Sequence, residues 1–171
     1  MFRKGDRVLY PHHGAAVIED LVERDVNGER KTYLMLHVRA SNLTLMVPVG
    51  NTEQVGIREV VSRSEVAGVF DRLREEEAWP PLNWSKRYKT NMAKLSSGDI
   101  YELAELIRDL TCREKVAALA SSERAMLLKA RGILLSELVF ALECPQEDAE
   151  ATLDGVLGET RNTRSRVQLS R

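Results

Sequence analysis

The chain is poor in cysteine and lacks any long hydrophobic run. Its two cysteines, Cys112 and Cys144, lie far apart and belong to no CxxC or Cys/His pattern, so we expect free thiols in a reducing compartment. The longest apolar stretches are a handful of residues, whereas a membrane-spanning helix needs about 20. Residues 1–6 (MFRKGD) carry charge where a signal peptide needs its apolar core. We therefore expect a cytoplasmic protein with no membrane partner.

An overall excess of positive charge is also missing. The chain has 25 lysines and arginines against 26 aspartates and glutamates, which gives a net charge of −1. Many DNA-binding domains are basic, so any contact with DNA must come from cations that gather locally. Such segregation exists, because an acidic run at 75–77 precedes residues 85–98, which hold four basic residues and no acidic one. This pattern is compatible with a protein that a partner delivers to DNA, and it disfavours one that searches DNA alone.

The sequence carries no signature of an enzyme. It has no GxGxxG motif, no Walker loop and no local Ser/His/Asp pattern. The pair His12 and His13 resembles a metal or catalytic site, but no carboxylate or cysteine stands at ligand spacing from it, and zinc needs three or four ligands. We interpret residues 10–14 (YPHHG) as a turn whose backbone requires Gly14. We expect no catalysis, no metal and no cofactor.

The first sixty residues have the alternation and the turn signals of short strands. Asn27-Gly28 between two apolar runs is the strongest short-range signal for a hairpin. Strands are predicted at residues 7–10, 15–26, 32–38, 43–49 and 55–60. A sheet this small is stable only if its edges are protected, and a curled barrel of the SH3 or Tudor kind achieves that.

After Val61 the hydrophobic period becomes helical. Helices are predicted to begin at a cap on Ser64, around a face of Tyr88, Met92 and Leu95, at a cap on Asp99, at Ser121 or Ser122, and near Pro145. We therefore predict an α+β protein with two domains. A Tudor-like β-barrel covers residues 1–61, an all-helical bundle covers residues 62–158, and residues 159–171 form a disordered tail.

A tryptophan stands directly before the basic stretch. It follows Pro80-Pro81, and the two prolines favour a stiff, non-helical approach to Trp84. A rigidly presented indole beside cations can stack on nucleic acid or wedge into it. Tryptophan is also mostly buried in proteins, so Trp84 could instead plug a core where two helices meet. This segment alone favours the core plug.

Five segments carry a resemblance to a known family. They are residues 4–14 (KGDRVLYPHHG), 42–48 (NLTLMVP), 83–89 (NWSKRYK), 95–99 (LSSGD) and 127–131 (LLKAR). In their order and content they resemble the CarD/CdnL family of bacterial transcription regulators, from about Phe2 to Leu157. The resemblance implies a Tudor-like domain that docks on the β subunit of RNA polymerase and a helical domain that contacts promoter DNA. It also implies stabilisation of the open promoter complex, and we expect a monomer.

The resemblance implies specific roles for the aromatic and basic side chains. The family's tryptophan aligns with Trp84 and lies against the minor groove at the upstream edge of the transcription bubble, which favours the wedge over the core plug. The implied contacts with phosphates come from Lys86, Arg87, Lys89, Arg124 and Lys129. For Arg124 and Lys129 taken singly, a solvated helix face is an equally good interpretation.

On the polymerase side, the resemblance places Arg24 at a position implicated in docking. Met46 departs from the family pattern, because actinobacterial members carry arginine there, although pairing along a strand edge does not need that charge. The near-neutral charge and Met46 leave an alternative open. In that alternative the protein is a polymerase-binding adaptor whose helical domain recruits another protein rather than DNA.

Overall fold

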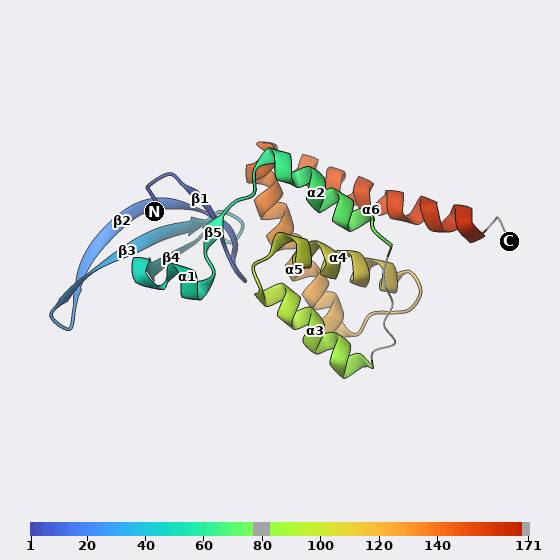
Figure 1. The fold of residues 1–171 in the computed structure, drawn as a ribbon, viewed down its shortest axis with the longest axis horizontal. Helices are drawn as coiled ribbons and strands as arrows, with labels where there is room; N and C mark the ends of the chain where they lie inside the picture. The colour runs from blue at the N-terminus through green and yellow to red at the C-terminus, as the bar shows by residue number, and fades with distance from the viewer. Residues whose placement is uncertain (77–82, 169–171) are drawn as a thin grey trace.

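The computed structural model describes residues 1–76 and 83–168, with the side chains of residues 160–168 left out. An antiparallel five-stranded sheet forms the N-terminal part, and helices form the rest (Figure 1). The strands are β1 (Arg7–Tyr10), β2 (Gly14–Val26), β3 (Glu29–Val38), β4 (Leu43–Pro48) and β5 (Arg58–Glu59), in the spatial order β4-β3-β2-β1-β5. This arrangement confirms the predicted α+β fold, in which a small β-domain precedes an all-helical bundle.

The sheet curls around a small core of its own. Its inner face buries Ile18 and Leu34, both 0% exposed. A β-bulge between Ile18 and Asp20 shifts the register of β2 against β3 and bends the long hairpin. At the hairpin tip, Asn27 and Gly28 have positive φ values of 53° and 83°, as a type I′ turn requires. The predicted hairpin is therefore confirmed.

The last strand is shorter than the sequence predicts. A strand is expected over residues 55–60, whereas β5 covers only Arg58–Glu59. The 3-10 turn η1 (Val49–Asn51) and the short helix α1 (Thr52–Val55) come before it. Gly56 ends α1 at a φ of 81°, and the Ile57 N–H donates to the Thr52 carbonyl at 3.0 Å. This left-handed cap lets Val55 close a helix instead of opening a strand.

The helices are α2 (Arg63–Arg74), α3 (Trp84–Ser96), α4 (Ile100–Glu114), α5 (Ser121–Leu142) and α6 (Gln146–Gln168). The cap of α2 is Ser62 and not the predicted Ser64, because Ser62 forms a capping box with Glu65, three residues later. In that box the Ser62 N–H donates to the Glu65 carboxylate at 2.7 Å, which lowers the pKa of Glu65. The predicted cap of α4 is confirmed, since the Asp99 carboxylate accepts the Tyr101 N–H at 2.7 Å.

The apolar stripes predicted for the helices form the core of the bundle. Leu106 and Ile107 of α4 pack in one cluster with Leu134 and Leu138 of α5, and all four are 0% exposed. The last helix adds Leu153, which is also 0% exposed. The packing of three helices on these stripes confirms the helical bundle.

The last helix extends into the segment that the sequence predicts to be a disordered tail. The helix α6 continues to Gln168, so the backbone of residues 159–168 is helical. This stretch contains neither proline nor glycine, and nothing in it stops the hydrogen-bond ladder that begins at Gln146. Residues 169–171 lie outside the described part of the chain.

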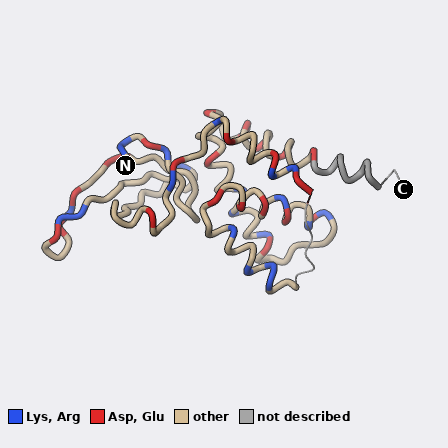
Figure 2. Tube along the Cα trace, in the orientation of Figure 1, with Lys and Arg blue, Asp and Glu red and all other residues tan. Residues whose placement is uncertain are grey.

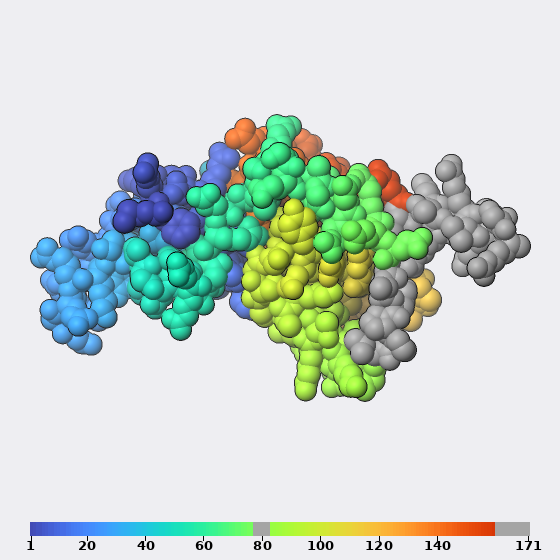
Figure 3. Space-filling view, in the orientation of Figure 1, coloured from blue at the N-terminus to red at the C-terminus, as the bar shows by residue number. Residues whose placement is uncertain are grey.

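A buried ion pair joins the sheet to the helices. Arg58, on β5, pairs with Glu137 of α5 through two hydrogen bonds of 2.6 and 3.0 Å. The Glu137 side chain is 0% exposed and also accepts the Val61 N–H at 3.0 Å. Arg58 Nε donates in turn to the carbonyl of Gly98 at 2.8 Å. The sheet, the linker after it and the α3–α4 junction therefore meet around one carboxylate, and the two parts are in contact in the space-filling view (Figure 3).

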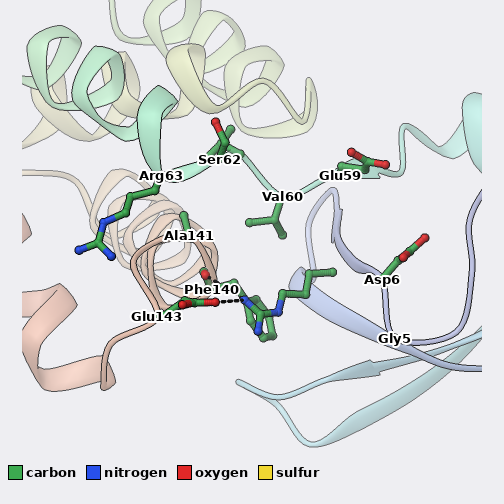
Figure 4. Close-up of a pocket in the computed structure, with 11 residues that line it drawn as sticks. Gly5, Asp6, Glu59, Val60, Ser62, Arg63, Phe140, Ala141 and Glu143 are labelled. Carbon is green, nitrogen blue, oxygen red and sulfur yellow. Dashed lines mark hydrogen bonds and ion pairs between the residues drawn. The ribbon is translucent and has the colours of Figure 1, made fainter.

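A second set of contacts holds β1 against the C-terminal end of α5. Arg7 donates to the Phe140 carbonyl at 3.2 Å and to the Glu143 carboxylate at 3.3 Å (Figure 4). Its guanidinium lies 5.4 Å from the centre of the Phe140 ring, close enough for a cation–π contact. These residues line an open cleft of about 610 Å³. The C-terminal end of α5 is thus fixed to the sheet as well.

Candidate nucleic-acid interface

Trp84 is the first residue of α3 and is half exposed. Asn83 caps the helix by accepting the Lys86 N–H at 2.9 Å, so the indole stands at a well-defined helix start. The Trp84 side chain is 50% exposed and stacks on Tyr88, with ring centroids 5.4 Å apart and planes at 23°. It is therefore a surface aromatic and not a core plug. Pro80 and Pro81, which are expected to stiffen the chain before Trp84, lie outside the described residues.

Two of the predicted phosphate contacts on α3 are exposed cations. Lys86 and Lys89 lie on the solvent side of the helix, where Figure 2 shows basic residues along α3. Within residues 1–76 and 83–159, neither side chain forms an ion pair. Each charge is therefore available to an external anion.

The third cation of this set is held inside the protein. Arg87 Nε donates to Glu123 at 2.8 Å, and the Glu123 side chain is only 2% exposed. Glu123 also accepts the Ala120 N–H at 3.3 Å at the start of α5. Arg87 therefore ties the first turn of α3 to the first turn of α5, and its guanidinium does not stand free in solvent as the sequence suggested. The reason is that a carboxylate 36 residues away occupies it.

The exposed face of α5 holds the two other predicted contacts. Arg124 and Lys129 are exposed, and neither forms an ion pair among the residues that the structure describes. Between them lies Leu128, which is 67% exposed and belongs to no buried cluster. Because Arg87 joins the first turns of α3 and α5, Arg124 in the first turn of α5 lies at the same end of the bundle as Trp84. Lys129 stands about 7.5 Å further along the helix than Arg124.

Sequence reasoning missed three residues of this interface, of which Glu123 is buried beneath it. Tyr88 supports the indole of Trp84, and its spacing of four residues on a helix is the signal that could have found it. Glu123 orders Arg87, and Leu128 is exposed although it adjoins the apolar stripe of α5. Neither of these two has a local signal, because only the packing of α3 on α5 decides which face is covered.

The residues expected to face the polymerase lie on the outer side of the sheet. Arg24 of β2 is exposed and stands opposite Lys31 of β3. Met46 stands opposite Met35 on the edge strand β4 and is 36% exposed. The outer face alternates with the buried inner one, so these side chains point away from the core that contains Leu34. The edge of β4 and an adjoining cationic and apolar face are thus available for a partner.

Other kinds of site are not evident in the described residues. No helix there is long and apolar enough to cross a bilayer. The same residues contain no cluster of three or more His, Cys, Asp or Glu side chains that could hold a metal ion. The fourth cation of the basic stretch, Lys94, pairs with Glu105 at 3.0 Å and so belongs to the fold.

Family models match both parts of the chain. The CarD-like/TRCF RID domain matches residues 2–61, and the CarD C-terminal domain matches residues 68–154. Together with the Tudor-like sheet and the helical bundle, these matches define a CarD-like transcription factor. The chain belongs to the CarD/CdnL family.

Two relatives illustrate the extent of the similarity. YdeB of Bacillus subtilis (strain 168), named as a candidate transcription factor, is 36% identical over 138 residues, or 81% of this chain and 90% of YdeB. The solution NMR structure of the 72-residue N-terminal domain of Myxococcus xanthus CarD shares 27% identity, covers 34% of this chain and 79% of that domain, and has a TM-score of 0.31.

Proposed function

We propose that this CarD-like transcription factor docks on the β subunit of RNA polymerase and stabilises the open promoter complex. In this proposal residues 1–61 bind the polymerase and residues 62–158 contact promoter DNA, as a monomer and without reading base sequence. Trp84 wedges into the minor groove at the upstream edge of the bubble. The observation that carries the proposal is the half-exposed indole, which is supported on Tyr88 and followed on the same helix by the exposed cations Lys86 and Lys89.

The energetics of this role are modest and within reach of one aromatic side chain. Opening DNA loses about 1–2 kcal/mol of stacking for each base-pair step. An indole at the fork offsets part of that loss by stacking on a base or by blocking reannealing. Because Trp84 already rests on Tyr88, little side-chain entropy is lost when it engages DNA.

The direct test is the lifetime of open complexes on a weak promoter, with and without the protein. We expect the protein to prolong that lifetime at a fixed polymerase concentration. An unchanged lifetime would contradict the proposal.

A competing function is the recruitment of another protein by the helical domain. The exposed Leu128 on α5 supports it. A salt-dependent, polymerase-dependent footprint just upstream of the bubble would eliminate that alternative.

The double substitution Lys86→Ala and Lys89→Ala should weaken promoter engagement. Each lost phosphate contact removes about one unit from the slope of log affinity against log salt. The loss should be similar on different promoters, since phosphates carry no base identity. The measurement is a salt titration of complex lifetime on two unrelated promoters. The matched control is Arg63→Ala, an exposed cation at the start of α2, which lies on the other side of the bundle from α3 (Figure 1).

The substitution Arg24→Glu should weaken binding to the polymerase at least tenfold and leave the helical part folded. An exposed cation that faces an acidic partner contributes attraction, and reversing its charge replaces attraction with repulsion. A pull-down with purified core polymerase measures the change. The control is Arg30→Glu, which reverses another exposed charge on the same hairpin. Arg30 lies 3.8 Å from Glu23 and 3.9 Å from Asp25, and exposed pairs of this kind contribute little to stability. Equal losses for both variants would show that Arg24 has no specific place in the interface.

A further inference from the structure

The β1–β2 turn, residues 10–14, has no part in the function proposed above, yet the fold fixes it firmly against α5. The Ala15 N–H donates to Ser136 Oγ of α5 at 2.9 Å. A Cβ on Gly14 would stand 2.7 Å from that oxygen, so only glycine fits between the turn and the helix. The ring of the buried Pro11 is packed so closely that a Cβ on Gly98 would lie 3.0 Å from it. The turn is therefore a rigid support.

This support presents two histidines to solvent. His12 is exposed at a φ of 68°, and the exposed His13 lies over Tyr10 with ring centroids 4.8 Å apart. Such a positive φ is unusual for a residue other than glycine, and it is kept here by the packing on either side. The metal or catalytic site that the histidine pair resembles in sequence needs further ligands, and the described residues supply no such cluster. The pair needs another explanation.

The turn projects toward the cationic face of α5. Gly14 lies against Ile133, and Lys129 is one helical turn earlier on the same side of the helix. Burial, followed by the positive charges of Lys129 and His13, lowers the pKa of His12, so Lys129 is within electrostatic reach of the imidazole. Of the three cations in residues 124–132, Arg131 pairs with Asp154 of α6 at 2.8 Å, whereas Arg124 and Lys129 form no ion pair among the described residues. Histidine and lysine donors thus converge on one surface whose nearby charges are positive.

We propose that His12 and Lys129 form a second phosphate-binding site, through which the N-terminal domain holds the DNA duplex beside the tryptophan. In this proposal the DNA-binding surface runs from Trp84 and the start of α3, through Arg124 and Leu128 on α5, to the turn that packs on α5. A duplex that follows it is held by phosphates at two ends, and the contacts are indifferent to base sequence. This inference depends on the proposed function, because it assumes that the bound DNA is the promoter that Trp84 engages.

Substitution of the two donors gives the first test. Lys129→Gln should lower the salt slope of promoter engagement by about one unit, and adding His12→Asn should weaken engagement by about a further tenfold. Asparagine tolerates a positive φ, so the second change preserves the turn. Arg63→Gln is the control. Full engagement by the double variant, with an unchanged melting curve, would overturn the inference.

A photoreactive residue in the complete complex of protein, polymerase and promoter gives the second test. Placed at Leu128, it should crosslink to duplex DNA upstream of the bubble. Placed at Ser85, beside Trp84, it reports on the proposed function alone. Crosslinks to DNA from position 85 but to polymerase, or to nothing, from position 128 would refute the second site and leave the wedge standing. Crosslinks to DNA from position 128 alone would support the second site and contradict the wedge.

Discussion

Replacing Arg58 with alanine should destabilise the protein by about 3–5 kcal/mol, because it leaves the carboxylate of Glu137 buried without its counter-ion. The Glu137 side chain is 0% exposed, and the Val61 N–H would be its remaining donor among the contacts described. Urea denaturation followed by circular dichroism measures the change in the free energy of unfolding. An exposed pair should behave differently. Asp154→Ala, which removes the partner of Arg131, should cost no more than about 1 kcal/mol.

The double variant Arg58→Met, Glu137→Leu separates the two roles of this ion pair. Exchanging a buried pair for apolar side chains is often neutral or stabilising, so most of the lost stability should return. The joint between sheet and helices would then lack its hydrogen bonds to Val61 and Gly98. We therefore expect a folded protein that stabilises open complexes less well. A double variant as unstable as Arg58→Ala would show that packing, and not the unpaired charge, determines the cost.

The sequence was sufficient wherever the structure depends on neighbours along the chain. The turn at Asn27-Gly28, the cap at Asp99 and the stripe of α5 are all local patterns, and each is confirmed. The strand expected at 55–60 is longer than β5, also for a local reason. Gly56 can end a helix as readily as it can interrupt a strand, and periodicity does not separate the two for so short a segment.

The candidate site could be predicted only in part, because charge availability depends on contacts that are distant in sequence. Lys86, Arg87 and Lys89 look equivalent in the sequence, yet Arg87 is paired with Glu123 and the two lysines are exposed. The role of Glu137 was equally invisible. A charged residue between the buried Leu134 and Leu138 is nevertheless a warning, since a carboxylate in an apolar stripe requires a buried partner.

Trp84→Ala should leave the fold almost intact and abolish much of the effect on the open complex. A buried tryptophan would cost about 3–5 kcal/mol on truncation. Trp84 is half exposed and its described aromatic contact is the stack on Tyr88, so we expect a loss of stability nearer to the roughly 0.5–1.5 kcal/mol of an aromatic pair. Polymerase binding should persist, because the sheet that carries Arg24 is untouched. The lifetime of the open complex should fall by about 5- to 30-fold if the indole supplies 1–2 kcal/mol.

Three measurements on the same variants make this outcome decisive. Chemical denaturation reports stability, a pull-down reports polymerase binding, and promoter dissociation kinetics report the open complex. Trp84→Phe keeps a flat ring at the helix start and should retain part of the lifetime, whereas Ser85→Ala changes the neighbouring position without touching the stack and should retain all of it. A strongly destabilised Trp84→Ala whose folded fraction still prolongs the open complex would refute the wedge. In that case the indole would be needed for the fold alone, and the cations of α3 and α5 would have to stabilise the open complex without it.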